Sequence, residues 1–482
     1  MKKDVILVYA GKPGMPNPEL PLSIIYLGWA LQKSGYNPKL LDMRVSPYDK
    51  VDFSKALCVG ISVTTNTVSY ALDIAKHVRK IDASLPIIWG GVHPSLLPVE
   101  TAENEYVDIA VRGEGELTLV EILQKLEAKE SLASVKGVTY RNGNEIKTNP
   151  DREFMDLKII DAKLPYHLLD LEGYPYIKKG SFSIQTSRGC PHRCGFCYNL
   201  SFNKRNWRAK SAEQVLEEIK YLVEEFKVNK IYTMGDDEYF INRQRIEEIC
   251  EGLLRENIGI GWGSFCRFDR FSKYDKPFID LIEKSGCLGL TFGGESGSPQ
   301  VLTAINKDIT IDQIITSTKK MAQTNMMQIV SFMCGLPGET EKDLEQTFNL
   351  VDLLLKINPK VIVNGIVTYT PYPGTSLYDL IVREYGFKPP QSLQQWADYS
   401  IYGNINAPWV DKKRQKLLET VSIMTRFVFY GKHYNIAPHI RFKHIYRMFN
   451  FLARTRWSHK YFGFPIEWML VKKMLKYLRG YV

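Results

Sequence analysis

Short apolar runs alternate with helical patterns over the first part of the chain, and this alternation constrains the fold more than any other feature. Strands and helices at such spacing are typical of a doubly wound parallel sheet, so an α/β, Rossmann-like domain is predicted over residues 1–150. Ligands of these sheets bind beyond the carboxyl ends of the strands. The predicted strands are 5–10, 39–42, 56–63, 86–89 and 109–112, and the predicted helices are 22–33, 67–80 and 116–127.

A second series of strands and helices begins near residue 181. Its six units predict a partial, open (β/α)6 barrel over residues 181–380 with a site at the carboxyl rim, because a full eight-unit barrel needs more chain. Between the two series, residues 137–147 are typical of a β-hairpin and residues 151–180 of a linker. The predicted barrel strands are 183–187, 229–234, 258–264, 287–293, 328–334 and 360–368.

Three cysteines follow the first barrel strand at C-x3-C-x2-C spacing: Cys190, Cys194 and Cys197. Thiolates this close together hold a soft metal centre. Since the loop supplies three ligands, a four-iron four-sulfur (4Fe-4S) cluster bound here would leave one iron open. A zinc site with His192, or with a distant cysteine, as fourth ligand is the alternative.

The run Thr-Ser-Arg-Gly at 186–189, followed by this triplet, resembles the signature of radical S-adenosylmethionine (radical SAM) enzymes. The resemblance implies that the open iron binds S-adenosylmethionine and that its reductive cleavage gives a 5′-deoxyadenosyl radical. It also implies an electron donor such as a flavodoxin or ferredoxin. The adenine would lie beside Phe196 and Tyr198, for which plain core packing is the alternative. In such enzymes the hard chemistry belongs to the cofactor, and the protein positions it.

Loops that end the later barrel strands carry further candidates for binding S-adenosylmethionine. A carboxylate of Asp236 or Asp237 can accept hydrogen bonds from the methionine ammonium, although Asp237 equally suits a helix cap. Arg267 can pair with a carboxylate of the cofactor or substrate, and Glu295 with Ser296 can hold ribose hydroxyls. Their order along the chain matches the B12-dependent radical SAM subfamily. The candidates are Asp236, Asp237, Arg267, Glu295, Ser296, Gly335 and Pro337.

Three loops at the strand ends of the first domain are rich in glycine and hydroxyl groups, and glycine lets a backbone approach a bulky ligand. Together they resemble the cobalamin-binding domain of the same subfamily, which implies that they line the corrinoid and its nucleotide tail. The Asp-x-His-x-x-Gly motif that supplies a cobalt ligand elsewhere is absent, so His93 is expected to orient backbone or tail without binding cobalt. The candidates are Thr64, Thr65, Asn66, Gly90, Gly91, His93, Gly113, Glu114 and Gly115.

Residues 381–482 form a third region, which is predicted to be helical, basic and rich in aromatic residues. From residue 412 onward, sixteen lysines and arginines face two glutamates, whereas the whole chain has a net charge of +10. Helical patterns cover 412–434 and 440–455. The apolar stripe of 468–478, edged with cations, is typical of an interfacial helix on an anionic membrane. A helical lid packed on the barrel is the alternative, and no nucleic-acid module is present.

The other five cysteines are expected to be small buried hydrophobes and not a disulfide framework. With no apolar run of about eighteen residues and no signal-peptide pattern at the start, the chain is expected to be cytoplasmic, with possible peripheral membrane contact. These cysteines are Cys58, Cys250, Cys266, Cys287 and Cys334.

The resemblance implies an enzyme that uses a 4Fe-4S cluster, S-adenosylmethionine and cobalamin. Its leading reaction would be methylation of an unactivated carbon. The basic, aromatic-rich C-terminal region, which the resemblance does not cover, favours a hydrophobic or lipid-like substrate. Oxidative cyclisation, ring contraction and carbon–carbon coupling are alternatives on the same scaffold. A non-catalytic corrinoid- or metal-binding regulator is the alternative from a different functional class.

Overall fold

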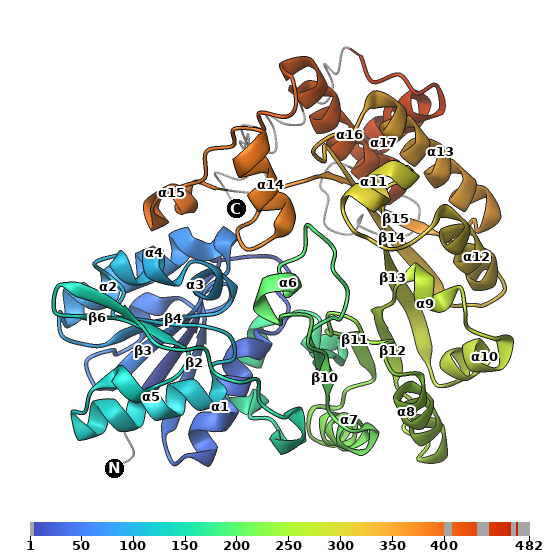
Figure 1. The fold of residues 1–482 in the computed structure, drawn as a ribbon. Helices are drawn as coiled ribbons and strands as arrows, with labels where there is room; N and C mark the ends of the chain where they lie inside the picture. Colours follow the sequence, from blue (N-terminus) through green and yellow to red (C-terminus); the bar gives the residue numbers. More distant parts are fainter. Residues whose placement is uncertain (1–3, 400–406, 431–442, 464–468, 471–482) are drawn as a thin grey trace.

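The computed structural model describes residues 4–399, 407–430, 443–463 and 469–470, and within them two sheets lie side by side (Figure 1). The expected α/β architecture is confirmed: each sheet is dominated by parallel strands, with helices between them. Among the helices of the described residues, none is long and apolar enough to cross a membrane.

The first sheet has seven strands in the order β2-β1-β3-β4-β5-β6-β7. The five strands from β2 to β5 in this order are parallel, and the hairpin β6–β7 continues the sheet antiparallel to β5. The alternation of buried side chains along β1 explains the two covering layers. Val5 and Leu7 join the core with α1 and α5, whereas Ile6 and Val8 pack with α2 on the other face. The strands are β1 (Asp4–Tyr9), β2 (Asn37–Asp42), β3 (Ala56–Ser62), β4 (Ile87–Gly90), β5 (Ile109–Val111), β6 (Val138–Asn142) and β7 (Glu145–Thr148), and the helices are α1 (Leu22–Lys33), α2 (Val68–Ile81), α3 (Val92–Leu96), α4 (Pro98–Glu103) and α5 (Glu116–Ala128).

The second sheet has six parallel strands in the order β8-β11-β12-β13-β14-β15. In the described residues its edge strands β8 and β15 do not pair, which agrees with the predicted open barrel. A short ribbon of β9 and β10 flanks the cysteine loop. The strands are β8 (Ser181–Ile184), β9 (Ser187–Arg188), β10 (Arg208–Ala209), β11 (Lys230–Met234), β12 (Gly261–Phe265), β13 (Cys287–Glu295), β14 (Met327–Cys334) and β15 (Ile362–Thr368).

Several helices of the barrel begin at strong capping signals. Ser211 and Gln214 form a capping box at the start of α7, and Thr310 with Gln313 does the same for α12. These caps satisfy backbone N–H groups that would otherwise lack partners. The helices are α6 (Asn199–Phe202), α7 (Ala212–Phe226), α8 (Arg243–Arg255), α9 (Phe268–Phe271), α10 (Lys276–Lys284), α11 (Pro299–Ala304), α12 (Ile311–Ala322) and α13 (Glu341–Ile357).

The predicted linker is part of the core. It folds into four 3-10 turns, at Leu157–Ile159, Tyr166–Leu168, Leu171–Gly173 and Ile177–Lys179. Its buried tyrosines bond to both domains: the Tyr174 hydroxyl donates to Asp42 Oδ2 at 2.7 Å, and the Tyr166 hydroxyl donates to Glu218 Oε1 at 3.0 Å. This segment therefore fixes how the two sheets sit against each other.

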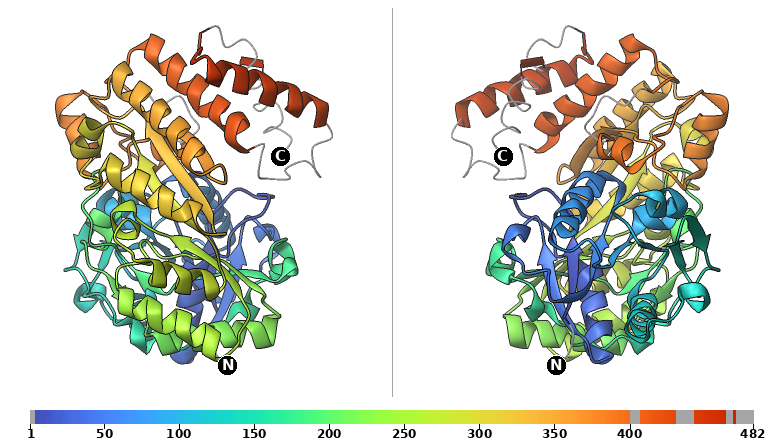
Figure 2. Two further views of the ribbon diagram at one scale, coloured as in Figure 1. Left: turned by 90° about the vertical axis from the view of Figure 1, so that its right-hand side faces the viewer. Right: turned by 90° about the vertical axis from the view of Figure 1, so that its left-hand side faces the viewer.

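The last region returns to both sheets. Trp396 of α15 is buried in the core of the first domain, beside α2. Helix α16 packs along β15 and beside α17 (Figure 2). The Thr425 hydroxyl of α16 accepts a hydrogen bond from Ile366 N at 3.1 Å. The predicted interfacial stripe at 468–478 lies almost wholly outside the described residues. The helices are α14 (Ser376–Glu384), α15 (Leu393–Ala397), α16 (Lys412–Tyr430) and α17 (Lys443–Ser458).

Candidate active site between the two sheets

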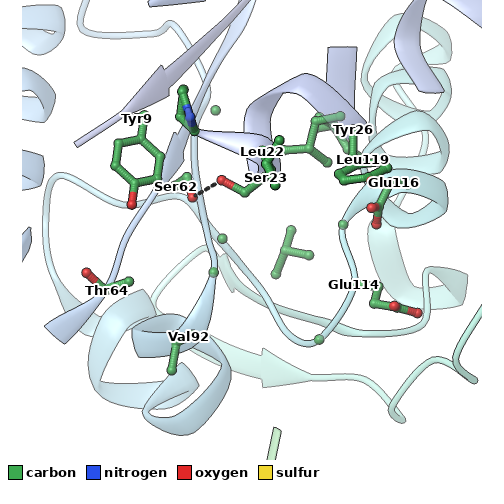
Figure 3. Close-up of a pocket in the computed structure, with 18 of the residues that line it drawn as sticks. Tyr9, Leu22, Ser23, Tyr26, Ser62, Thr64, Val92, Glu114, Glu116 and Leu119 are labelled. Atoms are coloured by element: carbon green, nitrogen blue, oxygen red, sulfur yellow. Dashed lines mark hydrogen bonds between the residues drawn. The ribbon is translucent and has the colours of Figure 1, made fainter. Parts of the chain in front are cut away.

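A cavity of about 350 Å³ lies at the carboxyl ends of the first sheet, where Ser62, Thr64 and Val92 are among its lining residues (Figure 3). Residues of the second domain form its far wall. The cavity brings together loops that are far apart in the sequence. Eight of the predicted site residues line it: Thr64, Gly90, Gly91, Gly113, Glu114 and Gly115 from the first domain, and Tyr198 and Asp237 from the second. The cavity therefore lies between the loops that are expected to bind the corrinoid and the side of the barrel that carries the cysteine loop.

Two glycines explain why the backbone can form the near wall. Gly91 has a φ of 101°, and a Cβ there would lie 2.7 Å from the carbonyl oxygen of Val63. A Cβ on Gly115 would lie 3.0 Å from Leu27, which also lines the cavity. Side chains at these positions would strain the loop or fill the space beside it. The absence of side chains here fits a large, flat ligand such as a corrinoid.

His93 does not line the cavity, and neither do Thr65 and Asn66. The His93 ring is fully buried, with Nδ1 3.2 Å from the Thr65 hydroxyl and its centroid 5.7 Å from that of Trp396. Burial lowers the pKa of His93 to about 4, so the imidazole is neutral near pH 7. Asn66 accepts a hydrogen bond from Thr64 at 2.6 Å. Thr65, Asn66 and His93 thus lie behind the cavity wall and support the loops that form it.

The neighbouring carboxylates Asp236 and Asp237 hold the cysteine loop. Buried Asp236 accepts hydrogen bonds from Thr186 N at 2.6 Å, Thr186 Oγ1 at 2.5 Å and Ser187 Oγ at 2.7 Å. Asp237 accepts from Gly189 N and from the Tyr198 hydroxyl, both at 2.9 Å. They thus fasten the chain on both sides of the three cysteines. The predicted alternative of a helix cap does not apply to Asp237.

The Arg267 guanidinium lies against the cysteine loop. Its Nη1 donates to Cys194 Sγ at 3.5 Å, while Nε donates to Asp269 Oδ1 at 2.8 Å and Nη2 to the Lys307 carbonyl at 2.7 Å. The sequence placed Arg267 at this rim but gave no sign of Lys307 or Asp269. The guanidinium therefore places a positive charge beside one of the three predicted cluster ligands.

The three cysteines suit an iron–sulfur cluster by their chemistry. Burial raises the pKa of Cys190 to about 12 and that of Cys197 to about 11, so without a metal these thiols stay protonated. A cluster would exchange those protons for iron, and Arg267 would stabilise the resulting charge. Among the described residues, no group of three His, Cys, Asp or Glu side chains converges as the ligands of a single metal ion do.

The remaining rim candidates are held mainly by protein contacts. Glu295 forms an ion pair with Lys307, and the fully buried Ser296 hydroxyl accepts from Ser298 N at 3.0 Å. Neither Glu295 nor Ser296 is among the described residues that line the cavity.

The Gly335–Pro337 loop is held by a residue just after it and by the C-terminal region. Gly335 N donates to Glu339 Oε2 at 2.6 Å, and its carbonyl accepts from Trp409 Nε1 at 2.9 Å. Pro337 is half-buried in the same loop. Thr340 caps α13.

Phe196 is half-buried and packs on a small apolar cluster that includes Ile305 and Leu336, with Lys307 Nζ 5.6 Å from its ring centroid. The other five cysteines are free and buried in the structure, in agreement with their predicted role as small hydrophobes.

Two family models match separate parts of the chain. The model of the B12 binding domain matches residues 14–123, and that of the Radical SAM superfamily matches residues 184–351. An uncharacterized methyltransferase of Pyrococcus horikoshii is 29% identical over 371 residues, which cover 75% of this chain and 78% of the relative. The anaerobic magnesium-protoporphyrin IX monomethyl ester cyclase of Rubrivivax gelatinosus is 26% identical over 373 residues, covering 74% of this chain and 65% of the cyclase.

A solved structure shares the fold. It is the radical S-adenosylmethionine methyltransferase TsrM from Kitasatospora setae, with cobalamin and a 4Fe-4S cluster bound. The TM-score is 0.66 at 19% sequence identity, and the match covers 80% of this chain and 76% of TsrM.

Proposed function

Since this chain belongs to the cobalamin-dependent radical SAM enzymes, we propose that it methylates an unactivated carbon of an apolar or lipid-like substrate. The observation that carries the proposal is the cavity between the two sheets. Its near wall is the set of loops suited to a corrinoid, and its far wall includes Tyr198, which directly follows the last cluster cysteine. A methyl donor and a radical generator would therefore lie on opposite sides of one cavity.

In this proposal each part of the chain has a defined task. Cys190, Cys194 and Cys197 would hold the 4Fe-4S cluster, and the loops at 62–66, 90–94 and 112–116 would hold cobalamin. Bound together, these groups and S-adenosylmethionine supply a hydrogen-abstracting radical and a transferable methyl group. The carboxylates of Asp236 and Asp237 keep the cysteine loop in place. An electron donor such as flavodoxin or ferredoxin supplies the electrons.

The proposal of an apolar substrate rests on the cavity, whose lining includes Leu22, Leu119 and Phe202. Apolar side chains in the wall of a cavity favour an apolar ligand.

Incubation with S-adenosylmethionine that carries a deuterated methyl group tests the reaction. The enzyme is reconstituted anaerobically with iron, sulfide and cobalamin, and is given a reductant and an apolar extract of its host. Label in a new product supports methyl transfer. The Cys194→Ala variant, which removes one cluster ligand, is the matched control and is expected to form no labelled product.

Oxidative cyclisation is the second candidate, and the likeness to the Rubrivivax gelatinosus cyclase favours it as the alternative. It predicts 5′-deoxyadenosine without label in the product. A corrinoid-binding regulator would give neither 5′-deoxyadenosine nor label.

A further inference from the structure

A buried group of four charged side chains links the corrinoid loop to the cysteine loop. Arg188, two positions before Cys190, donates through Nη1 to Glu114 Oε1 at 2.8 Å and through Nη2 to Glu116 Oε1 at 2.7 Å. Its side chain is 12% exposed, and those of the two glutamates are 10% and 5% exposed. With Arg208, these residues form what we term the interdomain clamp.

Arg208 completes the clamp from the other side of the cysteine loop. Its Nη1 lies 2.9 Å from both carboxylate oxygens of Glu114 and donates to the Met155 carbonyl at 2.9 Å. Glu114 also accepts from Met155 N at 3.0 Å, so this carboxylate contacts three segments of the chain.

The two arginines occupy opposed positions on one ribbon. Arg188 of β9 pairs directly with Arg208 of β10, and these strands enter and leave the loop that carries the cysteines. Like charges directly opposite each other destabilise a ribbon. Glu114 offsets this repulsion by bonding to both arginines, and these bonds stabilise the packing of the ribbon on the first domain. Burial alone would raise the pKa of Glu114, but the arginines hold it below its ordinary value.

The clamp borders the cavity without filling it. Glu114, Glu116 and Arg188 are all among its lining residues. The Arg188 guanidinium also lies 4.8 Å from the ring centroid of Tyr26, a cavity residue on α1. Both carboxylate oxygens of Glu114 bond to arginines. The main partners of Glu114 are therefore other residues of the protein, although the sequence predicts it as a cofactor-binding residue.

We propose that the interdomain clamp is a positioning device that fixes the separation and orientation of the corrinoid relative to the cluster. The clamp ties the loop expected to hold one group to the two strands that frame the other. This proposal rests on the proposed function only in requiring that both groups bind, and it holds whichever reaction follows.

Continuous-wave and pulsed EPR on the reconstituted enzyme test the clamp. With the cluster reduced and cobalamin in its Co(II) form, the wild type is expected to show one well-defined dipolar splitting between the two unpaired spins. Arg188→Gln, which breaks the contacts to both glutamates, is expected to retain iron and cobalt but to spread that splitting at least twofold. Arg188→Lys keeps the positive charge but lacks the two guanidinium nitrogens that bond to the two glutamates. The spread of its splitting is expected to lie between those of the wild type and Arg188→Gln.

Two further variants make the outcome decisive. Glu121→Gln removes a charge from the same helix, α5, where Glu121 pairs with Arg152 away from the clamp, and the wild-type splitting is expected. If Arg188→Gln loses a cofactor, the isosteric Glu114→Gln variant takes over the test. A wild-type splitting in a fully loaded clamp variant overturns the proposal. Loss of a cofactor from both variants also overturns it, since the clamp would then be a binding element. Failure of methyl transfer alone would leave the splitting unchanged and would refute only the proposed function.

Discussion

Arg267→Gln is expected to lower the reduction potential of the cluster. Reduction adds a negative charge, and the guanidinium stabilises that charge through Nη1, 3.5 Å from Cys194 Sγ. A unit charge at that distance contributes about 4 to 5 kcal/mol at an effective dielectric constant of 20. Asp269 accepts from Nε at 2.8 Å and offsets part of the effect. We therefore expect a net loss of about 2 kcal/mol, or roughly 90 mV for a one-electron couple.

An EPR-monitored redox titration of the reconstituted cluster, without cobalamin, measures this shift. Arg267→Lys retains the charge and is expected to shift the potential by less than half as much. Arg193→Gln is the matched control, because Arg193 lies within the cysteine loop but is 58% exposed and pairs with Asp308. Exposed pairs are screened, so its shift is expected to stay within about 20 mV. A shift this small for Arg267→Gln as well would refute the electrostatic role of the contact.

Three further predictions concern stability. Asp236→Ala leaves three donors of the 186–187 segment without their acceptor and is expected to cost about 3 kcal/mol, with loss of bound iron, measured by chemical unfolding and metal analysis. Gly91→Ala forces a Cβ against the Val63 carbonyl at a positive φ; we expect a cost of about 2 kcal/mol and weaker cobalamin retention in gel filtration. The pKa of His93 is lowered to about 4 from 6.5, so its stabilising effect is full above pH 6.5 and is lost as the pH falls toward 4. Between pH 7.5 and 5 the wild type should lose about 2 kcal/mol more than His93→Gln in urea unfolding, and equal losses would contradict this.

The regular elements could be predicted from the sequence because their periods are local. The strand expected at 5–10 is observed as Asp4–Tyr9, and the helix expected at 22–33 is observed as Leu22–Lys33. The hairpin at 137–147 was predicted as well, but not its union with the first sheet, because a hairpin pattern does not specify an edge. The segment 151–180 has no period because it consists of short 3-10 turns, so its packing between the domains was not predictable.

The candidate site follows the same division. The spacing of the cysteines and the glycines of the loops are local signals, and eight of the residues predicted from such signals line the cavity. Contacts between distant segments carry no such signal. Nothing near His93 indicates that Trp396 will cover it, and nothing near Arg267 indicates the contact with Cys194. For the same reason Arg188, although part of the recognised run, was not predicted to pair with Glu114.

The shared walls of the cavity limit how this protein can be recombined. A chimaera joined within the 151–180 segment would combine the 112–116 loop of one parent with the 185–208 ribbon of another. Such a hybrid would separate Glu114 from Arg188 and Arg208 unless both parents preserve that match. Exchange of the first domain should therefore preserve these contacts only when the 185–208 ribbon is exchanged with it. The smallest segment that can be exchanged is thus larger than either sheet.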